Sequence, residues 1–296
     1  MVDPSLDSNE LVDALTLSVI TIDGATLESQ DARGDGEAPK CRSLFFPGCA
    51  LVNYAPRLLI PVYQRLRQLG IIDGMTLVCC GEVFAFEENG RQLKAAYHEK
   101  LREQVLEKGI TRVITSCPSC NAVFRALLSE DLGIEVTILP EIFADLGYRI
   151  DIGEVSQLQA ATDVEPGCAG SSEMPRIAIH DSCSDRSCGD FAAAVRALFV
   201  DDLIGEMKNN REHSLCCGSR MYASGKREFA LKLAQHRYEQ AHEAKASMIV
   251  SYCAYCSNFL SQFQEELPIH HYLELLEGVD INWKENTTYL DRVYLL

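Results

Sequence analysis

The sequence predicts an α/β fold of two pseudo-symmetric halves, each a small, mostly parallel sheet flanked by helices with cysteines at the C-terminal ends of its strands. Short β-rich runs alternate with helical stretches, which is typical of a parallel sheet covered by helices. This alternation occurs twice along the chain. Four cysteines of the first half precede four of the second by 134, 137, 136 and 136 residues, pairing Cys49, Cys80, Cys117 and Cys120 with Cys183, Cys217, Cys253 and Cys256.

Composition and charge exclude several classes of protein. The chain has 296 residues, of which 47% are hydrophobic and 24% charged, as in ordinary globular proteins. Its net charge of −16 would repel phosphate backbones and anionic lipid, so we expect no nucleic-acid or membrane-surface partner. No apolar run approaches the ~18 residues of a membrane span. The acidic start, MVDPSLDSNE, does not resemble a secretory signal, and we expect a cytoplasmic protein.

The first part of the chain predicts an extension followed by one α/β half. Residues 1–40 end in ESQDARGDGEAPK and are expected to form a flexible acidic N-terminal extension. The first half is expected at residues 41–149. Its predicted strands are 44–48, 75–78, 112–116 and 135–139, and its predicted helices are 55–69, 88–108 and a third beginning at Asn121.

The same order of elements recurs after a connecting segment. Residues 150–175 are rich in Gly, Ser and Pro and are expected to form a linker. The second half, with a C-terminal tail, is expected at residues 176–296. Its predicted β-rich runs are 176–180, 213–215 and 247–251, and in 268–276 a strand is expected to run into a helix near His270 and His271. Its predicted helices are 191–204, 224–246 and a third beginning at Ser257.

Thirteen cysteines are the main chemical feature of the sequence. In a cytosolic chain, thiols stay reduced, so this number indicates metal or redox chemistry before disulfide bonds. Each half carries a single cysteine after its first strand, an adjacent pair followed by glycine, and then C-x-x-C. The candidate metal ligands are Cys49, Cys79, Cys80, Cys117 and Cys120 in the first half and Cys183, Cys216, Cys217, Cys253 and Cys256 in the second.

Five thiols per half favour a polynuclear metal centre. The C-terminal ends of parallel strands share one edge of a sheet, so each set should gather into one cluster. Thiolates suit Zn, Cu(I) and iron–sulfur clusters, but a tetrahedral zinc ion takes only four ligands. Adjacent cysteines also point in different directions on extended backbone, which suits them to different irons. Gly81 and Gly218, after the adjacent pairs, would let the backbone approach a bound cofactor.

These motifs resemble those of the CCG-domain, cysteine-rich iron–sulfur proteins, and in particular the heterodisulfide reductase component that has two such domains in tandem. They read FFPGC, CCGE and CPSC, then HDSC, CCGS and CAYC, within about residues 44–280. The resemblance implies a non-cubane [4Fe-4S] cluster in each half, held by that half's five cysteines. It also implies a small disulfide substrate reduced between the clusters, and ferredoxin-like iron–sulfur and flavoprotein subunits as partners.

Three functions remain open on the sequence alone. The first is an oxidoreductase subunit that reduces or forms a disulfide or thiol substrate. The second is an electron-transfer subunit of a flavoprotein dehydrogenase complex, of the lactate, glycolate or succinate type, with no substrate site of its own. The third is a zinc-binding structural module. The sequence has no dinucleotide fingerprint, P-loop or ferredoxin-type C-x-x-C-x-x-C run, so a flavin or cubane cluster would come from a partner.

A few residues outside the ligand sets are also candidates. His180 stands three residues before Cys183 and could donate a proton to a thiolate product, or could simply be held by hydrogen bonds. Arg220 and Lys226 could offset the charge of a cluster, or belong to a solvated face.

Three cysteines lie outside both five-cysteine sets. Cys188 could be a spare ligand or redox partner of the second set, or an ordinary loop thiol. Cys41 and Cys168 fall in segments predicted to be flexible, where an ordinary thiol is expected.

Overall fold

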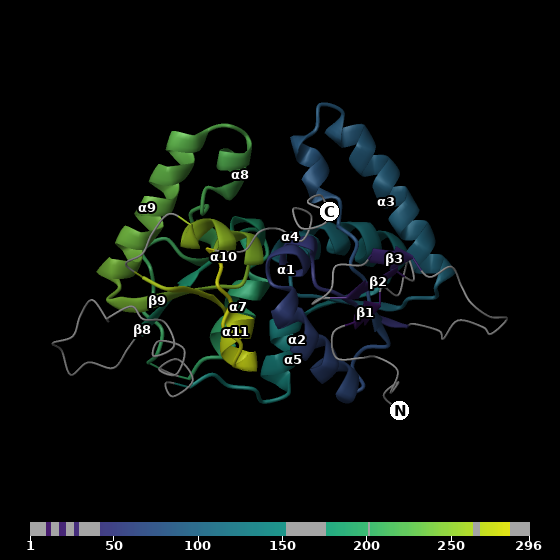
Figure 1. Cartoon of the computed structure of the whole chain (residues 1–296), viewed down its shortest axis with the longest axis horizontal. Coiled ribbons are helices and arrows are strands. Elements are labelled where there is room, and N and C mark those ends of the chain that lie inside the picture. The colour runs from purple at the N-terminus through teal and green to yellow at the C-terminus, as the bar shows by residue number, and fades with distance from the viewer. Residues whose placement is uncertain are drawn as a thin grey trace. The chain divides into compact units, whose positions relative to one another are not determined.

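A computed structural model describes residues 42–151, 176–200, 202–262 and 267–284, together with the backbone of three short N-terminal strands. The chain divides into two compact units, the first running to Leu139 and the second beginning at Pro140 (Figure 1). Nearly all of the predicted linker and the end of the predicted C-terminal tail lie outside the described residues. Within the described part of the chain, no helix is both long and apolar enough to cross a membrane.

The first unit contains a four-stranded parallel sheet. Its strand order is β5-β4-β6-β7, and all three strand pairs are parallel. Three of the predicted strands are confirmed, whereas of the second, predicted at 75–78, only Met75 lies in a strand, which is two residues long. The strands are β4 (Ser43–Phe46), β5 (Gly74–Met75), β6 (Arg112–Thr115) and β7 (Glu135–Ile138).

Helices of the first unit bury one apolar face against this core. In α2 (Pro56–Gln68), Leu58, Leu59, Val62 and Leu66 recur at helical spacing and are fully buried. Pro56 begins this helix, where its missing N–H has no helical partner to lose. The remaining helical segments are α1 (Cys49–Tyr54), η1 (Glu82–Phe86), α3 (Gly90–Glu107), α4 (Pro118–Phe124) and η2 (Arg125–Glu130).

The second unit contains a three-stranded parallel sheet in the order β10-β9-β8. The predicted strand at 213–215 is wrong. Residues 211–213 form a 3-10 turn, because backbone groups here bond to side chains: Arg211 N–H donates to Asp181, and the Ser214 carbonyl accepts from Arg186. A single bridge between Ile177 and Ile204 takes the place of a fourth strand. The strands are β8 (Arg176–His180), β9 (Ala246–Ser251) and β10 (Ile269–His271).

The helix predicted at 191–204 is shorter in the structure. It ends at Ala197, because Phe199 and Ile204 lie on bridges to Ile150 and Ile177 that need extended backbone. The other long predicted helix is confirmed as α9, preceded by the separate short α8. The helical segments are α5 (Leu139–Asp145), η3 (Cys183–Asp185), α7 (Asp190–Ala197), η4 (Arg211–His213), α8 (Ser219–Ala223), α9 (Arg227–Glu243), α10 (Ala254–Ser261) and α11 (Tyr272–Glu277).

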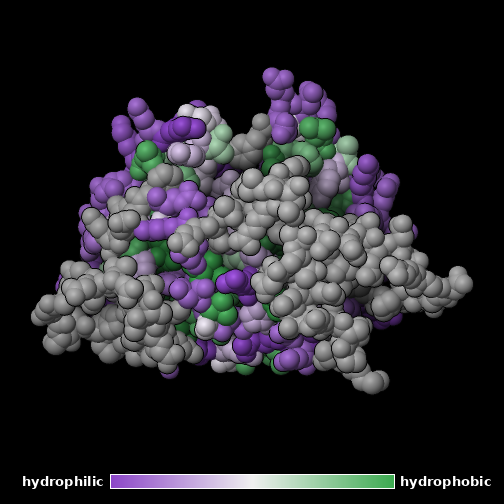
Figure 2. Space-filling model, viewed as in Figure 1, coloured by the Kyte–Doolittle hydropathy of each residue, from purple (hydrophilic) through white to green (hydrophobic). Residues whose placement is uncertain are grey.

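Each unit has its own hydrophobic core, and cysteines form part of it. In the first unit, Cys80 and Cys120 pack with Leu101 and Val105 of α3. In the second, Cys217, Cys253 and Cys256 pack with α9 and α10. Figure 2 shows mainly hydrophilic side chains on the visible outer surfaces of α3 and α9. The long helices therefore separate the cysteine-bearing cores from solvent.

Within the predicted N-terminal extension, three short strands form an antiparallel sheet in the order β1-β2-β3. They are β1 (Glu10–Val12), β2 (Ser18–Thr21) and β3 (Leu27–Ser29). The rest of residues 1–41 lies outside the described residues, so the predicted flexibility of the extension stays a prediction.

Candidate metal centres

The first unit brings its five cysteine side chains together at the C-terminal edge of its sheet. Cys49 begins α1, the adjacent pair follows β5, and Cys117 is the N-cap of α4. The Sγ atoms of Cys49 and Cys79 are 3.7 Å apart. Thiol hydrogen bonds link the set in one order: Cys49, Cys79, Cys80, Cys120 and Cys117. We call this set the first thiol cluster.

The second unit repeats this arrangement. Cys183 begins η3, the adjacent pair precedes α8, and Cys253 is the N-cap of α10. Thiol hydrogen bonds link Cys183, Cys216, Cys217, Cys256 and Cys253, in the order found in the first unit. We call this set the second thiol cluster. The sequence repeat therefore corresponds to a repeated side-chain geometry.

In each cluster the two adjacent cysteines face different partners. Cys79 bonds to Cys49, whereas Cys80 bonds to Cys120. In the second cluster, Cys216 bonds to Cys183 and Cys217 to Cys256. An adjacent pair that diverges in this way suits two atoms of a polynuclear centre better than one tetrahedral ion.

Glycine conformation brings a backbone N–H group to one sulfur of each cluster. Gly81 and Gly218 have φ of 91° and 103°, a left-handed region that favours glycine. Gly81 N–H donates to Cys79 Sγ at 3.3 Å, and Gly218 N–H donates to Cys216 Sγ at 3.4 Å. Both donors would stabilise negative charge on sulfur. The structure thus places an N–H group of each glycine beside a thiol, and the predicted role of the two glycines beside a bound cofactor stays a prediction.

The thiols in each cluster differ in acidity because they share protons. Hydrogen bonds from the Cys49 and Cys80 thiols lower the pKa of Cys79 to about 2. Hydrogen bonds from Cys183 and Cys217 likewise lower the pKa of Cys216 to about 2. Each cluster therefore presents one thiolate readily, at the partly exposed Cys79 or Cys216, as thiolate-binding metals require.

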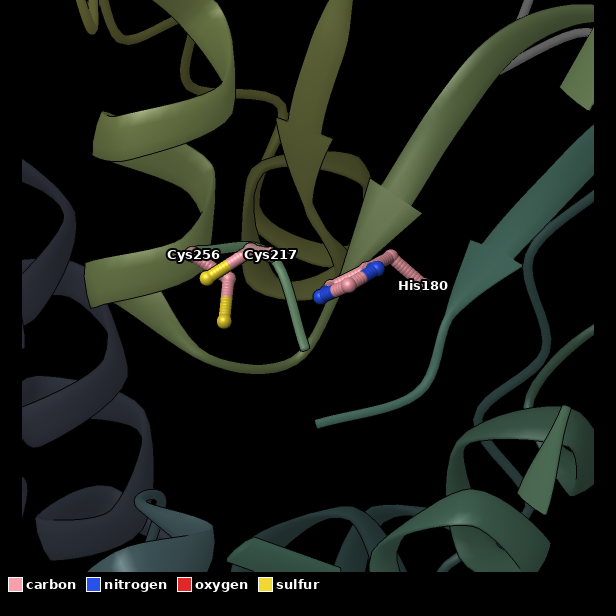
Figure 3. A group of neighbouring side chains, drawn as sticks. All are labelled: His180, Cys217 and Cys256. Carbon is pink, nitrogen blue, oxygen red and sulfur yellow. The ribbon is translucent and has the colours of Figure 1, made fainter. Parts of the chain in front are cut away.

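A buried histidine lies beside the second thiol cluster. The fully buried His180 ends β8. One of its ring nitrogens and the Sγ atoms of Cys217 and Cys256 all lie within 4.8 Å of one another. Figure 3 shows the outer ring nitrogen on the side of the two sulfur atoms. Arg237 of α9 donates from Nε to His180 Nδ1 at 3.1 Å. Burial, followed by the charge of Arg237, lowers the pKa of His180 to about 3.

Arg237 is the site residue that sequence reasoning missed. The two cations suggested by the sequence, Arg220 and Lys226, are exposed, whereas Arg237 is fully buried. A signal was present: Ala230, Ala234 and Ala241 share the buried face of α9 with this arginine. A cation on an otherwise apolar helical stripe indicates a buried partner.

The remaining cysteines either have other hydrogen-bond partners or lie outside the described residues. Cys188 Sγ donates to Asp185 Oδ1 at 3.4 Å, and the structure gives it no hydrogen bond to the second cluster. Burial and the nearby carboxylate raise its pKa. Cys41 and Cys168 lie outside the described residues.

Comparison with known proteins supports the repeat. The model of the CCG family, described as a cysteine-rich domain, matches residues 43–125 and 177–261. The chain is 26% identical over 250 residues to one of the subunits of dihydromethanophenazine:CoB--CoM heterodisulfide reductase of Methanosarcina acetivorans, covering 78% of this chain and 56% of that protein. It is 23% identical over 253 residues to one of the subunits of fumarate reductase (CoM/CoB) of Methanothermobacter marburgensis, covering 82% of this chain and 47% of that one.

The chain thus spans about half the length of these relatives. Among solved structures, glutamate racemase RacE1 of Bacillus anthracis gives a TM-score of only 0.32 at 12% identity, over 87% of this chain and 82% of that one. The two family matches, by contrast, cover more than half of the 296 residues and include all ten clustered cysteines. This chain belongs to the CCG cysteine-rich domain family and carries two copies of the domain.

Proposed function

We propose that this chain is an iron–sulfur redox subunit in which each thiol cluster holds one [4Fe-4S] cluster, of the non-cubane type. The observation that carries the proposal is the pair of complete five-thiol sets with the same order of contacts. When bound, such clusters supply one-electron exchange. A role as a zinc-binding structural module would leave a fifth thiol in each unit without a purpose.

The chain's own residues would hold and tune these centres. The diverging adjacent cysteines would reach different irons, and the Gly81 and Gly218 N–H groups would stabilise charge on sulfur. Gly48 lets the backbone pass close to the N-cap of α4, because a Cβ there would lie 2.6 Å from Cys117 Cβ. Each cluster combines buried cysteines with partly exposed ones.

We infer that the substrate is a small disulfide or the corresponding thiols. Two electrons and two protons convert one disulfide into two thiols, and the electrons would come from an iron–sulfur partner subunit supplied by a flavoprotein subunit. Two relatives named as subunits of a heterodisulfide reductase support this substrate class. Two redox centres in one chain also suit a two-electron reaction. The proton-donor role considered for His180, and the cytoplasmic location, stay predictions.

A second candidate function is electron relay without a substrate site. The relative named as one of the subunits of fumarate reductase (CoM/CoB) favours it, because a protein similar to this chain is then part of a second kind of reductase. In this alternative the same thiol clusters would carry electrons between a flavoprotein and an acceptor. The two functions differ in whether a disulfide or thiol contacts a cluster.

The test is iron, acid-labile sulfide and zinc analysis of the full chain purified without oxygen, followed by electron paramagnetic resonance with and without an added disulfide or thiol. We expect about eight irons and eight sulfides per chain, with signals that change on addition. Iron and sulfide with resonance signals that do not change when a disulfide or thiol is added would support the relay function instead. Stoichiometric zinc without sulfide would contradict both.

A further inference from the structure

The two units differ in the side chain at the end of the strand that leads to the first cysteine. In β4, Phe46 pairs with Thr115 of β6; in β8, His180 pairs with Ser251 of β9. Phe46 is buried against Phe124, with ring centroids 4.5 Å apart. Matching positions in the repeat therefore hold a ring without a polar donor in one unit and an imidazole in the other.

Arg237 determines which tautomer this imidazole adopts. An arginine side chain has only N–H donors and cannot accept a hydrogen bond. Since its Nε donates to His180 Nδ1, that nitrogen must carry the lone pair. In the neutral ring the proton is therefore on Nε2, which is buried and has no hydrogen-bond partner in the described structure. This N–H faces the sulfurs of Cys217 and Cys256 (Figure 3).

Arg237 is itself held firmly. Its Nη1 donates to the Asn209 carbonyl and to Gln240 Oε1, both at 2.8 Å. Gln240 in turn donates to Asn209 Oδ1 at 2.7 Å. Burial lowers the pKa of Arg237 only to about 10, so the guanidinium is charged at neutral pH. The imidazole thus stands between a buried cation and two cluster sulfurs.

The same tautomer argues against His180 as a metal ligand. A histidine that binds metal through Nε2 needs its lone pair there and usually donates from Nδ1 to an acceptor. Arg237 cannot be that acceptor. The first unit also contains a histidine near its adjacent cysteine pair, but His98 Nε2 bonds to the backbone carbonyl of Cys80 at 2.9 Å. It therefore directs its polar atom at backbone oxygen and not at sulfur.

We propose that His180, oriented by Arg237, is a positioning residue whose Nε2–H, unpaired in this structure, would donate to the sulfurs of the second thiol cluster once that cluster holds its centre, making this centre easier to reduce than the one in the first unit. The inference rests on the proposed iron–sulfur function. Its physical basis is that an N–H donor and a nearby cation stabilise the extra negative charge that reduction adds. Electrons would then collect at the second cluster.

The test is a potentiometric titration of the anaerobically purified full chain, followed by electron paramagnetic resonance. Cys80→Ala and Cys217→Ala chains assign the signals to the two clusters. We expect His180→Phe, which copies Phe46, to lower the reduced-to-oxidised ratio of the second cluster about tenfold at fixed potential, or about 59 mV for one electron. The first cluster serves as the internal control and should not change.

His180→Gln is the matched variant, because its amide retains an N–H donor near the Nε2 position. We expect it to keep most of the wild-type potential, which a purely structural role would not predict. Nitrogen-15 NMR of histidine-labelled wild-type chain should also show a protonated Nε2 and an unprotonated Nδ1, on a signal lost in His180→Gln. Should His180→Phe fail to fold, these two measurements still decide the question.

The outcomes separate the two proposals. No shift in His180→Phe, equal shifts in both clusters, or a proton on Nδ1 would overturn the role of His180 while leaving the iron–sulfur function intact. Absence of iron and sulfide from the wild-type chain would overturn the proposed function and this inference with it. A shift confined to the second cluster and rescued by glutamine would establish the role.

Discussion

The two units hold the same thiols in different surroundings. Both link five cysteines in one order and direct a glycine N–H group at one sulfur. They differ in the residue before the first cysteine: Gly48 has φ of 86°, whereas its counterpart Ser182 bonds to Cys253. They differ again at Phe46 and His180. The two units therefore share the geometry of their thiols but differ in the buried residues around them, as expected if they hold two similar centres with different electronic tasks.

The largest expected effect comes from breaking one cluster at a time. Cys80→Ala and Cys217→Ala each remove a buried thiol that contacts two others, so each chain should lose about half of its iron and keep the other half. Iron and sulfide analysis after anaerobic purification measures this. Cys188→Ser is the matched control, because that thiol bonds to Asp185, and it should keep its full content. Unchanged iron in both alanine variants would contradict the ligand assignment.

Alanine substitution of the glycines that follow the adjacent cysteines should have a smaller effect, a loss of stability that differs between the two units. A Cβ at Gly218 would lie 2.5 Å from the backbone carbonyl oxygen of Ala230, which cannot move alone. At Gly81 the nearest atoms would be side-chain atoms of His98 and Tyr97, at 3.0 Å. We expect Gly218→Ala to lower the free energy of unfolding by about 3 kcal/mol and Gly81→Ala by about 2 kcal/mol.

Anaerobic urea unfolding followed by far-ultraviolet circular dichroism measures both glycine variants. Trp283, the one tryptophan of the chain, is buried in the second unit, so its fluorescence reports that unit separately. Gly225→Ala is the control, because this glycine also has a positive φ but open space around it; we expect a cost of about 1 kcal/mol. Equal losses in Gly218→Ala and Gly225→Ala would show that the close contact carries no cost.

The smallest expected effect is a pH dependence specific to the second unit. Hydrogen bonds from Arg196 hold the pKa of Glu206 below its usual value of 4.5. A carboxyl with a lowered folded-state pKa contributes stability above its unfolded pKa and loses it as the pH falls through the folded value. Glu206→Gln should therefore cost about 0.5–1 kcal/mol at pH 7, since the glutamate is partly exposed, and progressively less below pH 4.5.

Urea unfolding followed by Trp283 fluorescence, repeated from pH 7 down to the acid limit of folding, measures this difference. Glu243→Gln changes the same charge at an exposed position near the end of α9 and serves as the control. A wild-type advantage over Glu206→Gln that stays constant with pH would exclude the ion pair as its source.

Most of the fold could be predicted because its signals are local. Alternating short apolar strands and helices identified the parallel sheets, and the cysteine offsets identified the repeat. The predictions that failed depended on tertiary contacts. Residues 213–215 read as a strand, but the backbone beside them bonds to Asp181 and Arg186, which are distant in sequence. The helix begun at Asp190 stops early because the chain beyond it bridges to two other segments.

The sequence by itself determined the family, the two five-cysteine sets and the glycines beside them, because ligand type and spacing are written directly in the chain. Only the tertiary structure decided how the two sets differ. His180 and Arg237 are 57 residues apart, and neither residue alone reveals the tautomer or the direction of its N–H group. That direction exists only once a strand and a helix pack together and bury a cation against an imidazole, where each hydrogen bond constrains the next.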